Sequence, residues 1–341
     1  MTGVGWMADQ RTAAGVGLGL LAGLSFGSSG PAAKPLLQSG WSPGAVVLVR
    51  IGLAAAALLL PTLWLLRGRI RPARGAVGRL VVFGVLAVAG MQICYFAAIS
   101  QLPVGVALLV EYSGIVLVVL WQWAVRRSRP AALTLVGAAV ALAGLVLVID
   151  PFAGAGAGSI SVTGLLWAFG AAIGLAAYYL LAGRIDPQLP PLLVVTGGMV
   201  VGVPAVALAG VTGLLPLTAG TTPVTMAGHS LPWLLPVLWL GLVTAAVAYV
   251  SGVLAVQRLG STVASFLGLS EVLFAVAIAW LLLSEIPTAV QGLGAVAVLA
   301  GVVGVQCGEA RSTSPTVPTS DPSPSCPIDA ATVEPGVSPR E

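Results

Sequence analysis

The sequence LPVGVALLVEYSGIVLVVLWQW, residues 102–123, and the sequence STVASFLGLSEVLFAVAIAWLLL, residues 261–283, decide the fold class. At about 1.5 Å per residue, each stretch is long enough to cross a hydrocarbon core of about 30 Å. Each also contains one glutamate, Glu111 in the first and Glu271 in the second. An ionised carboxylate at the centre of a membrane-spanning helix costs roughly 2.5 to 3.5 kcal/mol, so such a residue normally faces a bundle interior or a water-filled path. The two glutamates are therefore the best clue to function.

The composition agrees with a chain that lies in a lipid bilayer. Hydrophobic residues make up 58% of the 341 residues and charged residues 8%, against about 25% charged in soluble domains. The net charge of +4 comes from basic residues in short loops without interleaved aromatic residues, which disfavours a nucleic-acid partner. Cys94, Cys307 and Cys326 are odd in number and lack paired spacing, which disfavours a disulfide framework and a metal site. We expect no cofactor.

Ten apolar stretches of about 20 residues predict an all-α integral membrane protein. The seventh is the weakest, because Pro204, Pro216 and several glycines interrupt it. The first is longer than the core of a signal peptide and lacks an A-x-A cleavage site, so we expect it to be retained. The ten stretches lie at about 13–33, 43–66, 77–100, 103–125, 131–149, 161–183, 190–212, 233–256, 261–283 and 288–307.

The distribution of arginine predicts the orientation, because short cytoplasmic loops carry an excess of Lys and Arg. Arginines fall in the loops that follow the even-numbered spans, whereas the opposite loops contain only Lys34. We therefore expect both termini, including segment 1–12, on the cytoplasmic side of the cytoplasmic membrane, and the Gly-rich loop 151–160 outside. Segment 309–341, rich in Pro, Ser and Thr, is expected to be a disordered cytoplasmic tail. The arginines are Arg67, Arg69, Arg71, Arg74, Arg79, Arg126, Arg127, Arg129, Arg184 and Arg258.

An internal repeat with an offset of 157 residues divides the chain into two five-span halves, 13–150 and 161–308. An odd number of spans in each half makes the second half enter the membrane from the opposite side. The loop charges agree, since RRSRP (126–130) is basic and its counterpart SEIP (284–287) is acidic. Inverted repeats of this kind place substrate sites near the midplane, where the halves meet. The matching residues are Leu102, Val106, Ala107, Trp123, Pro130, Gly137 and Gly144 with Leu259, Val263, Ala264, Trp280, Pro287, Gly294 and Gly301.

Four stretches resemble a known family: 28–60 with Lys34 and Arg50, the region around Glu111, 161–184, and 247–303. They look like drug/metabolite transporters of the EamA type, in particular the amino-acid exporter branch that exports threonine and homoserine. The resemblance implies ten helices in two inverted halves, a central cavity, and export of amino acids or other small metabolites by alternating access, often coupled to protons. The family commonly has proline directly after the glutamate of its ninth helix, where this chain has Val272.

Arg50 and Glu111 lie at matching depths, since each is about eight positions into a span that starts outside. They can form an ion pair, or they can bind the carboxylate and the ammonium group of a zwitterionic substrate. Glu271 has no basic residue at its depth. Because burial disfavours the charged form of a carboxyl group, we expect Glu271 to bind a proton or a substrate amine. The alternative is a protonated side chain with a structural hydrogen bond.

Several polar and aromatic residues in other spans can line the same cavity, although aromatic residues near helix ends often serve as interface anchors. We include Gln92, Tyr95, Tyr112, Trp167, Tyr178, Tyr249 and Ser270. Gly15, Gly19, Gly23 and Gly27 recur every four residues, which predicts close helix packing. Lys34 and Glu285 lie near helix ends, and we interpret them as surface residues unless they act as a gate.

A secondary active transporter of a small molecule, with a proton as a possible coupling ion, accounts for these features best. A membrane enzyme is disfavoured, because the only histidine, His229, lies in the loop before the eighth span and no catalytic cluster is evident. A lipid scramblase, or a structural membrane protein without ion-coupled transport, remains the alternative.

Overall fold

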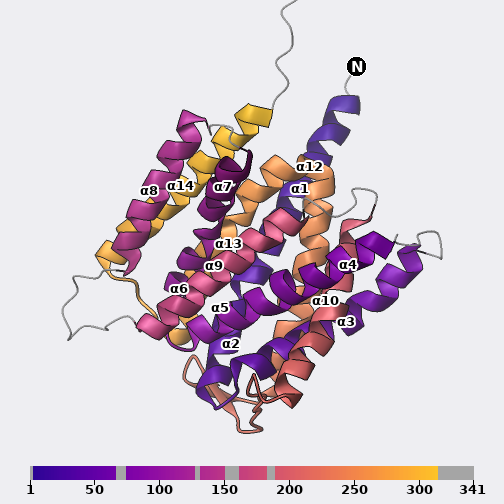
Figure 1. The fold of residues 1–341 in the computed structure, drawn as a ribbon, viewed down its shortest axis with the longest axis vertical. Coiled ribbons are helices and arrows are strands. Elements are labelled where there is room, and N and C mark those ends of the chain that lie inside the picture. Colours follow the sequence, from indigo (N-terminus) through magenta and orange to yellow (C-terminus); the bar gives the residue numbers. More distant parts are fainter. Residues whose placement is uncertain (1–2, 67–73, 127–130, 150–160, 183–188, 314–341) are drawn as a thin grey trace, which may run out of the picture.

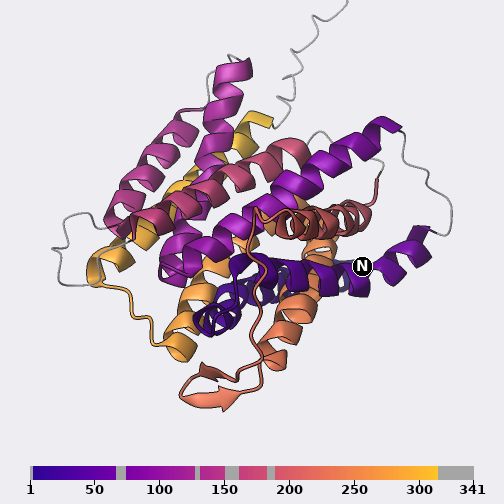
Figure 2. The ribbon, with the colours of Figure 1, turned by 60° about the horizontal axis from the view of Figure 1, so that its bottom comes forward.

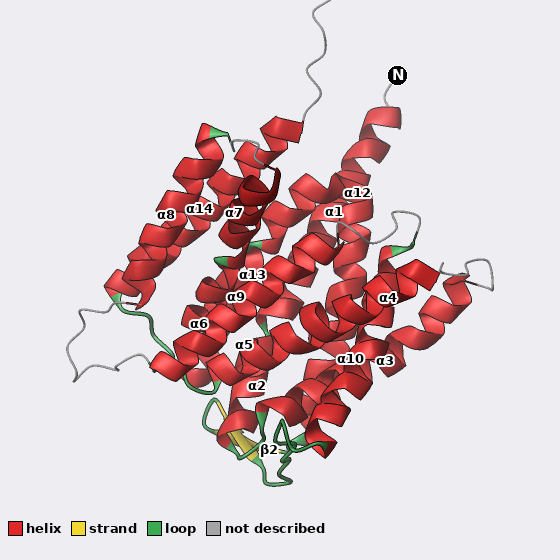
Figure 3. Cartoon of the chain, viewed as in Figure 1, coloured by secondary structure: helices red, strands yellow, loops and turns green. Residues whose placement is uncertain are grey.

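The computed structural model describes residues 3–66, 74–126, 131–149, 161–182 and 189–313, which are mostly helical (Figures 1 and 3). The arginines predicted in loops at Arg67, Arg69, Arg71, Arg127, Arg129 and Arg184 lie outside these residues, as do loop 151–160 and positions 314–341. The helices are α1 (Gly3–Gly27), α2 (Ser29–Gln38), α3 (Pro43–Leu66), α4 (Arg74–Val82), η1 (Phe83–Gly90), α5 (Met91–Ile99), α6 (Val104–Tyr112), α7 (Gly114–Arg126), α8 (Ala132–Ile149), α9 (Val162–Ala182), α10 (Pro191–Val211), α11 (Leu234–Leu238), η2 (Trp239–Val247), α12 (Ala248–Gly268), α13 (Ser270–Leu283) and α14 (Ala289–Thr313).

In the described residues, eight helical segments are long enough and apolar enough to cross a membrane. Two further apolar helices, Ala132–Val148 and Ser270–Leu283, are shorter and occupy the places of the predicted fifth and ninth spans. The doubtful seventh span is helical as α10, with Pro204 inside it. Many leucines on the outside are exposed, for example Leu60 at 74% and Leu281 at 71%, as expected of a surface that faces lipid rather than water.

The prediction of an all-α chain is corrected by a small hairpin between α10 and α11. Strand β1 (Val224–Met226) pairs antiparallel with β2 (His229–Leu231), and the hairpin projects from the helical body (Figure 2). Its turn places Ala227 at φ 50° and Gly228 at φ 77°, the left-handed conformation that two-residue hairpin turns require. The predicted loop before the eighth span therefore contains the only strands among the described residues.

Three predicted spans are interrupted rather than continuous. The first breaks at Ser28, between α1 and α2, the fourth at Ser113, between α6 and α7, and the ninth at Leu269, between α12 and α13. At Ser113 both the backbone N–H and the hydroxyl donate to the carbonyl of Val110, at 3.1 and 2.6 Å. This local bonding competes with the regular helical pattern and bends the helix. The break at Leu269 forms without a proline at Val272.

Helix α12 contains the predicted turn between spans eight and nine. A Cβ atom on Gly252 would lie 3.8 Å from Ala22, and one on the neighbouring Gly23 would overlap the hydroxyl of Ser270. Residues 252 and 270 would be about 27 Å apart along a straight helix, yet both pack against adjacent residues of α1. The chain therefore reverses within α12, with Arg258 exposed near the turn.

Two π-helical segments occupy equivalent places in the two halves. Segment η1 covers Phe83–Gly90 and η2 covers Trp239–Val247, so the offset of 157 residues superimposes them. π-helical turns are rare and occur frequently at functional sites. Gln92 and Tyr249, which follow the two segments, are also related by the offset.

The two halves interlock, because each helix packs mainly against helices of the other half. α1 packs on α12 and α13, while its counterpart α9 packs on α5, α6 and α7; α3 packs on η2, while α10 packs on η1. The last helices of the two halves, α8 and α14, lie side by side (Figure 1). A cavity enclosed by such a bundle is necessarily lined by both halves.

Glycines form the contact between α8 and α14. A Cβ atom on Gly137 would lie 2.7 Å from the carbonyl oxygen of Gly301, and one on Gly144 would lie 2.8 Å from that of Gly294. Residue numbers therefore increase along α8 while those of the contacting residues in α14 decrease, so the two helices are antiparallel. The contacts are also reciprocal, because the offset converts the first pair into the second. The repeat glycines identified in the sequence are therefore packing residues, and so are those of α1, where Gly19 meets Leu267.

Candidate functional site

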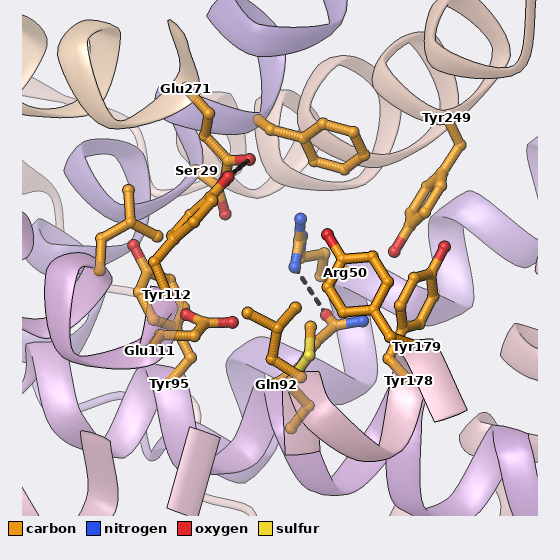
Figure 4. A pocket seen from close by; sticks show the side chains of 14 residues that line it. Ser29, Arg50, Gln92, Tyr95, Glu111, Tyr112, Tyr178, Tyr179, Tyr249 and Glu271 are labelled. Carbon is orange, nitrogen blue, oxygen red and sulfur yellow. Dashed lines mark hydrogen bonds between the residues drawn. The ribbon is translucent and has the colours of Figure 1, made fainter. Parts of the chain in front are cut away.

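A cavity lies where the two halves meet, with about 200 Å³ of space for water-sized molecules (Figure 4). Its polar wall comes from helices of both halves, and the charged groups are Arg50 from α3, Glu111 from α6 and Glu271 from α13. Eight of the ten residues predicted for the site line it. The complete lining is Phe26, Ser29, Arg50, Met91, Gln92, Tyr95, Leu108, Glu111, Tyr112, Leu175, Tyr178, Tyr179, Tyr249 and Glu271.

Arg50 is held in place by hydrogen bonds to one residue of each half of the chain. Its Nη1 donates to Gln92 Oε1 at 2.6 Å, its Nη2 donates to the carbonyl of Thr244 at 3.1 Å, and its Nε donates to the Thr244 hydroxyl at 3.3 Å. The guanidinium also lies 5.4 Å from the centre of the Phe96 ring. A guanidinium has five N–H donors, so the three bonds leave two donors for a ligand. Thr244, in η2, was not identified from the sequence.

Glu111 is 6% exposed and accepts no hydrogen bond from any described residue. The sequence placed it beside Arg50, and both side chains do line the cavity, but no salt bridge joins them within the described part of the chain. A buried carboxylate without a donor is costly. Glu111, at the end of α6, is therefore the group in the cavity that most needs a proton or a ligand.

Glu271 lines the same cavity from the first turn of α13. The hydroxyl of Tyr112 donates to Glu271 Oε2 at 3.1 Å, across the boundary between the two halves (Figure 4). No basic residue forms a salt bridge with it in the described residues. The N-terminal turn of a helix favours a negative charge, so Glu271 has two stabilising contacts that Glu111 lacks.

Ser29 is a site residue that sequence reasoning missed. Ser29 is 4% exposed and lines the cavity, and its hydroxyl has no hydrogen-bond partner among the described residues. Because buried hydroxyls are nearly always bonded, this one is available to a ligand. The break of the first span at Ser28 places it there, and a serine pair before a proline (SSGP, residues 28–31) is the only signal in the sequence.

Three tyrosines form the other side of the cavity. Tyr178 and Tyr179 come from α9 and Tyr249 from α12, and their hydroxyl groups face the same space (Figure 4). Phe83 packs on Tyr178 with ring centres 5.4 Å apart, and Phe26 packs edge-on against Tyr249 at 4.9 Å. This side provides aromatic surface with hydroxyl groups and no charge. Tyr179 was not predicted, although it adjoins Tyr178 in the sequence.

Two predicted residues lie outside the cavity. Trp167 is 42% exposed on the outer surface of α9, where a large aromatic side chain meets lipid. Ser270 lies against Gly23 of α1, and its buried hydroxyl has no hydrogen-bond partner in the part of the chain that the structure describes. Both residues share a helix with lining residues but project from another face of it. No group of three or more potential metal ligands occurs in the described residues.

Comparison with known protein families identifies the family of this chain. A model of the EamA-like transporter family matches residues 13–150 and 162–306. The chain belongs to the EamA-like transporter family. Members of the EamA family are multi-pass membrane transporters of small molecules rather than enzymes, and the two matches make this a chain of two EamA repeats.

A solved structure supports the fold alone. It is described only as the crystal structure of a protein, shares 20% sequence identity and has a TM-score of 0.58, with 86% of this chain and 98% of that chain covered. No curated protein matches the chain. The EamA membership therefore supplies the general function, and the chemistry of the cavity must supply the rest.

Proposed function

We propose that this EamA protein is a secondary active transporter that exports zwitterionic small metabolites, amino acids among them, across the cytoplasmic membrane by alternating access. The observation that carries the proposal is the charge arrangement in one cavity between the repeats. Arg50 presents two unused donors, and Glu111 and Glu271 present carboxyl groups that no cation neutralises in the described residues. A cavity of about 200 Å³ suits a small substrate.

The three charged groups provide one binding place for the carboxylate of a zwitterion and another for its ammonium group. A planar guanidinium with two free N–H groups matches the two oxygens of a carboxylate, and Gln92 and Thr244 hold it ready. The ammonium group of the substrate then binds among Glu111, Glu271 and the hydroxyl of Ser29. The substrate side chain is left facing the tyrosines of α9 and α12.

Charge balance supports proton coupling. A bound zwitterion brings one negative and one positive group to a cavity that has one guanidinium and two carboxyl groups, so one carboxyl remains without a cation. A proton neutralises that group, as favoured in a low-dielectric environment. We assign the substrate ammonium to Glu111, which accepts no hydrogen bond in the described residues, and this leaves the proton for Glu271.

The packing supports an inverted arrangement of the two repeats. The antiparallel, reciprocal contact between α8 and α14 is what a two-fold axis perpendicular to both helices produces. Such an axis lies in the membrane plane when the helices cross the membrane. With ten spans and the arginines in alternate loops, both termini lie in the cytoplasm.

Transport by purified protein in liposomes tests the proposal. Vesicles are loaded with labelled amino acids, and efflux is measured with and without a pH gradient, for the intact protein and for Arg50→Ala. We expect efflux that the gradient accelerates and that Arg50→Ala lowers at least tenfold. Arg50→Ala, which removes the carboxylate site, should leave any lipid movement unchanged.

A lipid-scrambling assay on the same vesicles distinguishes the alternative function. Lipid exchange between leaflets without gradient-dependent amino-acid flux contradicts the proposal. Flux of a zwitterion together with intact leaflet asymmetry supports it.

A further inference from the structure

We infer that the ion pair between Lys34 and Glu285 is the gate that closes the cavity toward the outside. We further infer that the gate opens when the carboxyl groups in the cavity bind a proton or an ammonium group. This inference rests on the proposed transport function, because a gate has meaning only where a substrate passes. Lys34 belongs to α2 in the first repeat, and Glu285 follows α13 in the second. The pair therefore joins the two repeats directly.

Three interactions hold this ion pair, which we call the latch, in place. Lys34 Nζ contacts Glu285 Oε1 and donates to the carbonyl of Leu102 at 2.8 Å. Glu285 Oε2 accepts from the backbone N–H of Val104 at 2.8 Å. The side chains of Lys34 and Glu285 are only 12% and 18% exposed. Surface ion pairs are usually exposed and weak, whereas this one is mostly buried and bonded at both ends.

The latch lies at the end of the cavity away from Arg258. A Cβ atom on Gly30 would lie 2.5 Å from both the Tyr95 hydroxyl and Val104 Cγ1, so α2, α5 and α6 are in close contact between the cavity and the latch. Tyr179, near the C-terminal end of α9, lines the cavity and keeps 45% of its surface exposed. The close contacts at Gly30 therefore separate the cavity from the latch, whereas Tyr179 leaves part of its surface exposed on the side of α9.

Both helices that carry the carboxyl groups of the cavity also end at the latch. Helix α6 begins at Val104, which bonds Glu285, and ends beside Glu111. Helix α13 begins beside Glu271 and ends at Leu283, two residues before Glu285. A helix moves as a rigid element, so binding of a proton or an ammonium group at one end is transmitted to the latch at the other. Two such connections, one from each repeat, couple occupancy of the cavity to the gate.

The backbone at the latch has a conformation that supports this role. Ser284 follows α13 with φ 56° and ψ 28°, the left-handed region in which glycine is the usual residue after a helix. Its N–H and that of Glu285 bond back to the carbonyls of Trp280 and Ala279, at 3.1 and 3.4 Å. This turn directs Glu285 toward Lys34. Non-glycine residues in this region cluster at functional sites and switches.

Thiol labelling of the cavity tests the gate without a substrate. Ser29→Cys is introduced into a protein whose native cysteines are replaced by serine, and an impermeant thiol reagent is added to right-side-out or inverted vesicles. With an intact latch, we expect labelling in inverted vesicles and slow labelling in right-side-out vesicles. Lys34→Gln and Glu285→Gln should each raise the right-side-out rate at least tenfold, and the exchange of both charges, Lys34→Glu with Glu285→Lys, should lower it again.

Gln101→Ala is the matched control. Gln101 accepts hydrogen bonds from Ser161 and Thr163 at the same end of the molecule, but these exposed contacts touch neither carboxyl-bearing helix. Its loss should leave the labelling rate unchanged. An unchanged rate in Lys34→Gln and Glu285→Gln, or an equal increase in Gln101→Ala, would overturn the gate.

A cross-link separates failure of the gate from failure of the transport function. Lys34→Cys and Glu285→Cys are joined by a short reagent that is cleaved by reduction. We expect the cross-linked protein to lose at least nine-tenths of its efflux and to regain it after reduction. Efflux that continues through fully cross-linked protein overturns the gate and leaves transport standing. Absence of efflux from the protein with an intact latch rejects the transport function, whereas the labelling result above stands independently of it.

Discussion

At the scale of single residues, the three charged groups of the cavity differ in how the protein supports them. Arg50 has three hydrogen bonds and an aromatic ring, Glu271 has one tyrosine, and Glu111 has no donor in the described residues. A charged group with many hydrogen-bond partners keeps its charge and its position. A charged group with few such partners gains or loses its charge more readily when a proton or a ligand binds. The guanidinium is therefore the fixed element of the site and the carboxyl groups are the variable ones.

Replacement of Glu271 by glutamine tests its role as the proton carrier. Glutamine resembles the protonated acid but cannot release a proton, so Glu271→Gln should abolish accumulation against a pH gradient while substrate exchange persists. The measurement is counterflow and gradient-driven transport in the same vesicles. Tyr112→Phe, which removes the hydrogen bond and keeps the acid, should still accumulate substrate. Full gradient-driven transport by Glu271→Gln would show that another group carries the proton.

Double-mutant cycles test which residue supports Arg50. The 2.6 Å bond to Gln92 predicts a coupling of about 1 kcal/mol or more between Arg50→Ala and Gln92→Ala, in the range known for contacting residues. The cycle with Glu111→Ala should give less, because no salt bridge joins the two residues in the described part of the chain. Thermal unfolding in detergent measures both. A larger coupling to Glu111 would restore the direct ion pair expected from their matching depths.

The sequence predicted the charged residues of the site better than their contacts. Apolar stretches make a glutamate conspicuous, so Glu111 and Glu271 could be identified from their surroundings alone. The position of Arg50 along its span predicted a shared depth but not its rotation toward Gln92 and Thr244. Ser29 could not be found, because its place depends on the break at Ser28, and the hydrogen bonds that break a helix are not evident in an apolar pattern.

At the scale of helices, the breaks give the site its shape. Glu111 stands directly before the break at Ser113, and Glu271 stands directly after the equivalent break at Leu269. The two carboxyl groups therefore occupy opposite sides of related discontinuities. Broken helices at equivalent places in two repeats are a recurrent device of transporters. The apolar stretches predicted spans 103–125 and 261–283 correctly as helical, but an apolar stretch does not indicate where a helix is interrupted.

The glycine contact between α8 and α14 predicts a marked difference between two glycines. Gly144→Ala places a methyl group 2.6 Å from the backbone nitrogen of Val298, and overpacking of this kind typically costs about 1 to 3 kcal/mol. Gly292→Ala in α14 meets nothing within 4 Å and should be neutral or stabilising by up to about 1 kcal/mol. Thermal unfolding of the two purified variants provides the comparison. Equal stability would mean that α8 and α14 are not in contact.

At the scale of the whole molecule, Arg258 and the latch lie toward opposite ends. Arg258 is exposed near the reversal in α12 and packs near Gly15 of α1, while Gln101 is exposed beside the start of α9. The proposed orientation assigns the first to the cytoplasm and the second to the outside. The family match establishes a membrane transporter with two repeats, and the direction of insertion is the property that a whole-cell experiment can decide.

Cysteine labelling in intact cells tests this orientation. In a protein without its native cysteines, Gln101→Cys should react with an impermeant thiol reagent, and Arg258→Cys should react only after the cells are permeabilised. The expected ratio of labelling rates is at least tenfold. The reverse pattern would place the latch on the cytoplasmic side and make the present conformation open toward the outside.

The interlocked packing of the repeats has a consequence for synthesis. Gly15 of α1 packs against Leu259, and the glycine face of α8 packs against α14, so the helices of the first repeat leave the ribosome long before their partners exist. At roughly 5 to 20 residues per second, the 244 residues that separate Gly15 from Leu259 take roughly 10 to 50 s to translate. During that interval the half-made protein rests in the bilayer with its glycine surfaces against lipid and its buried charges without their final neighbours. Insertion factors that shield such an intermediate should therefore limit the yield of this protein more than the stability of the finished bundle does.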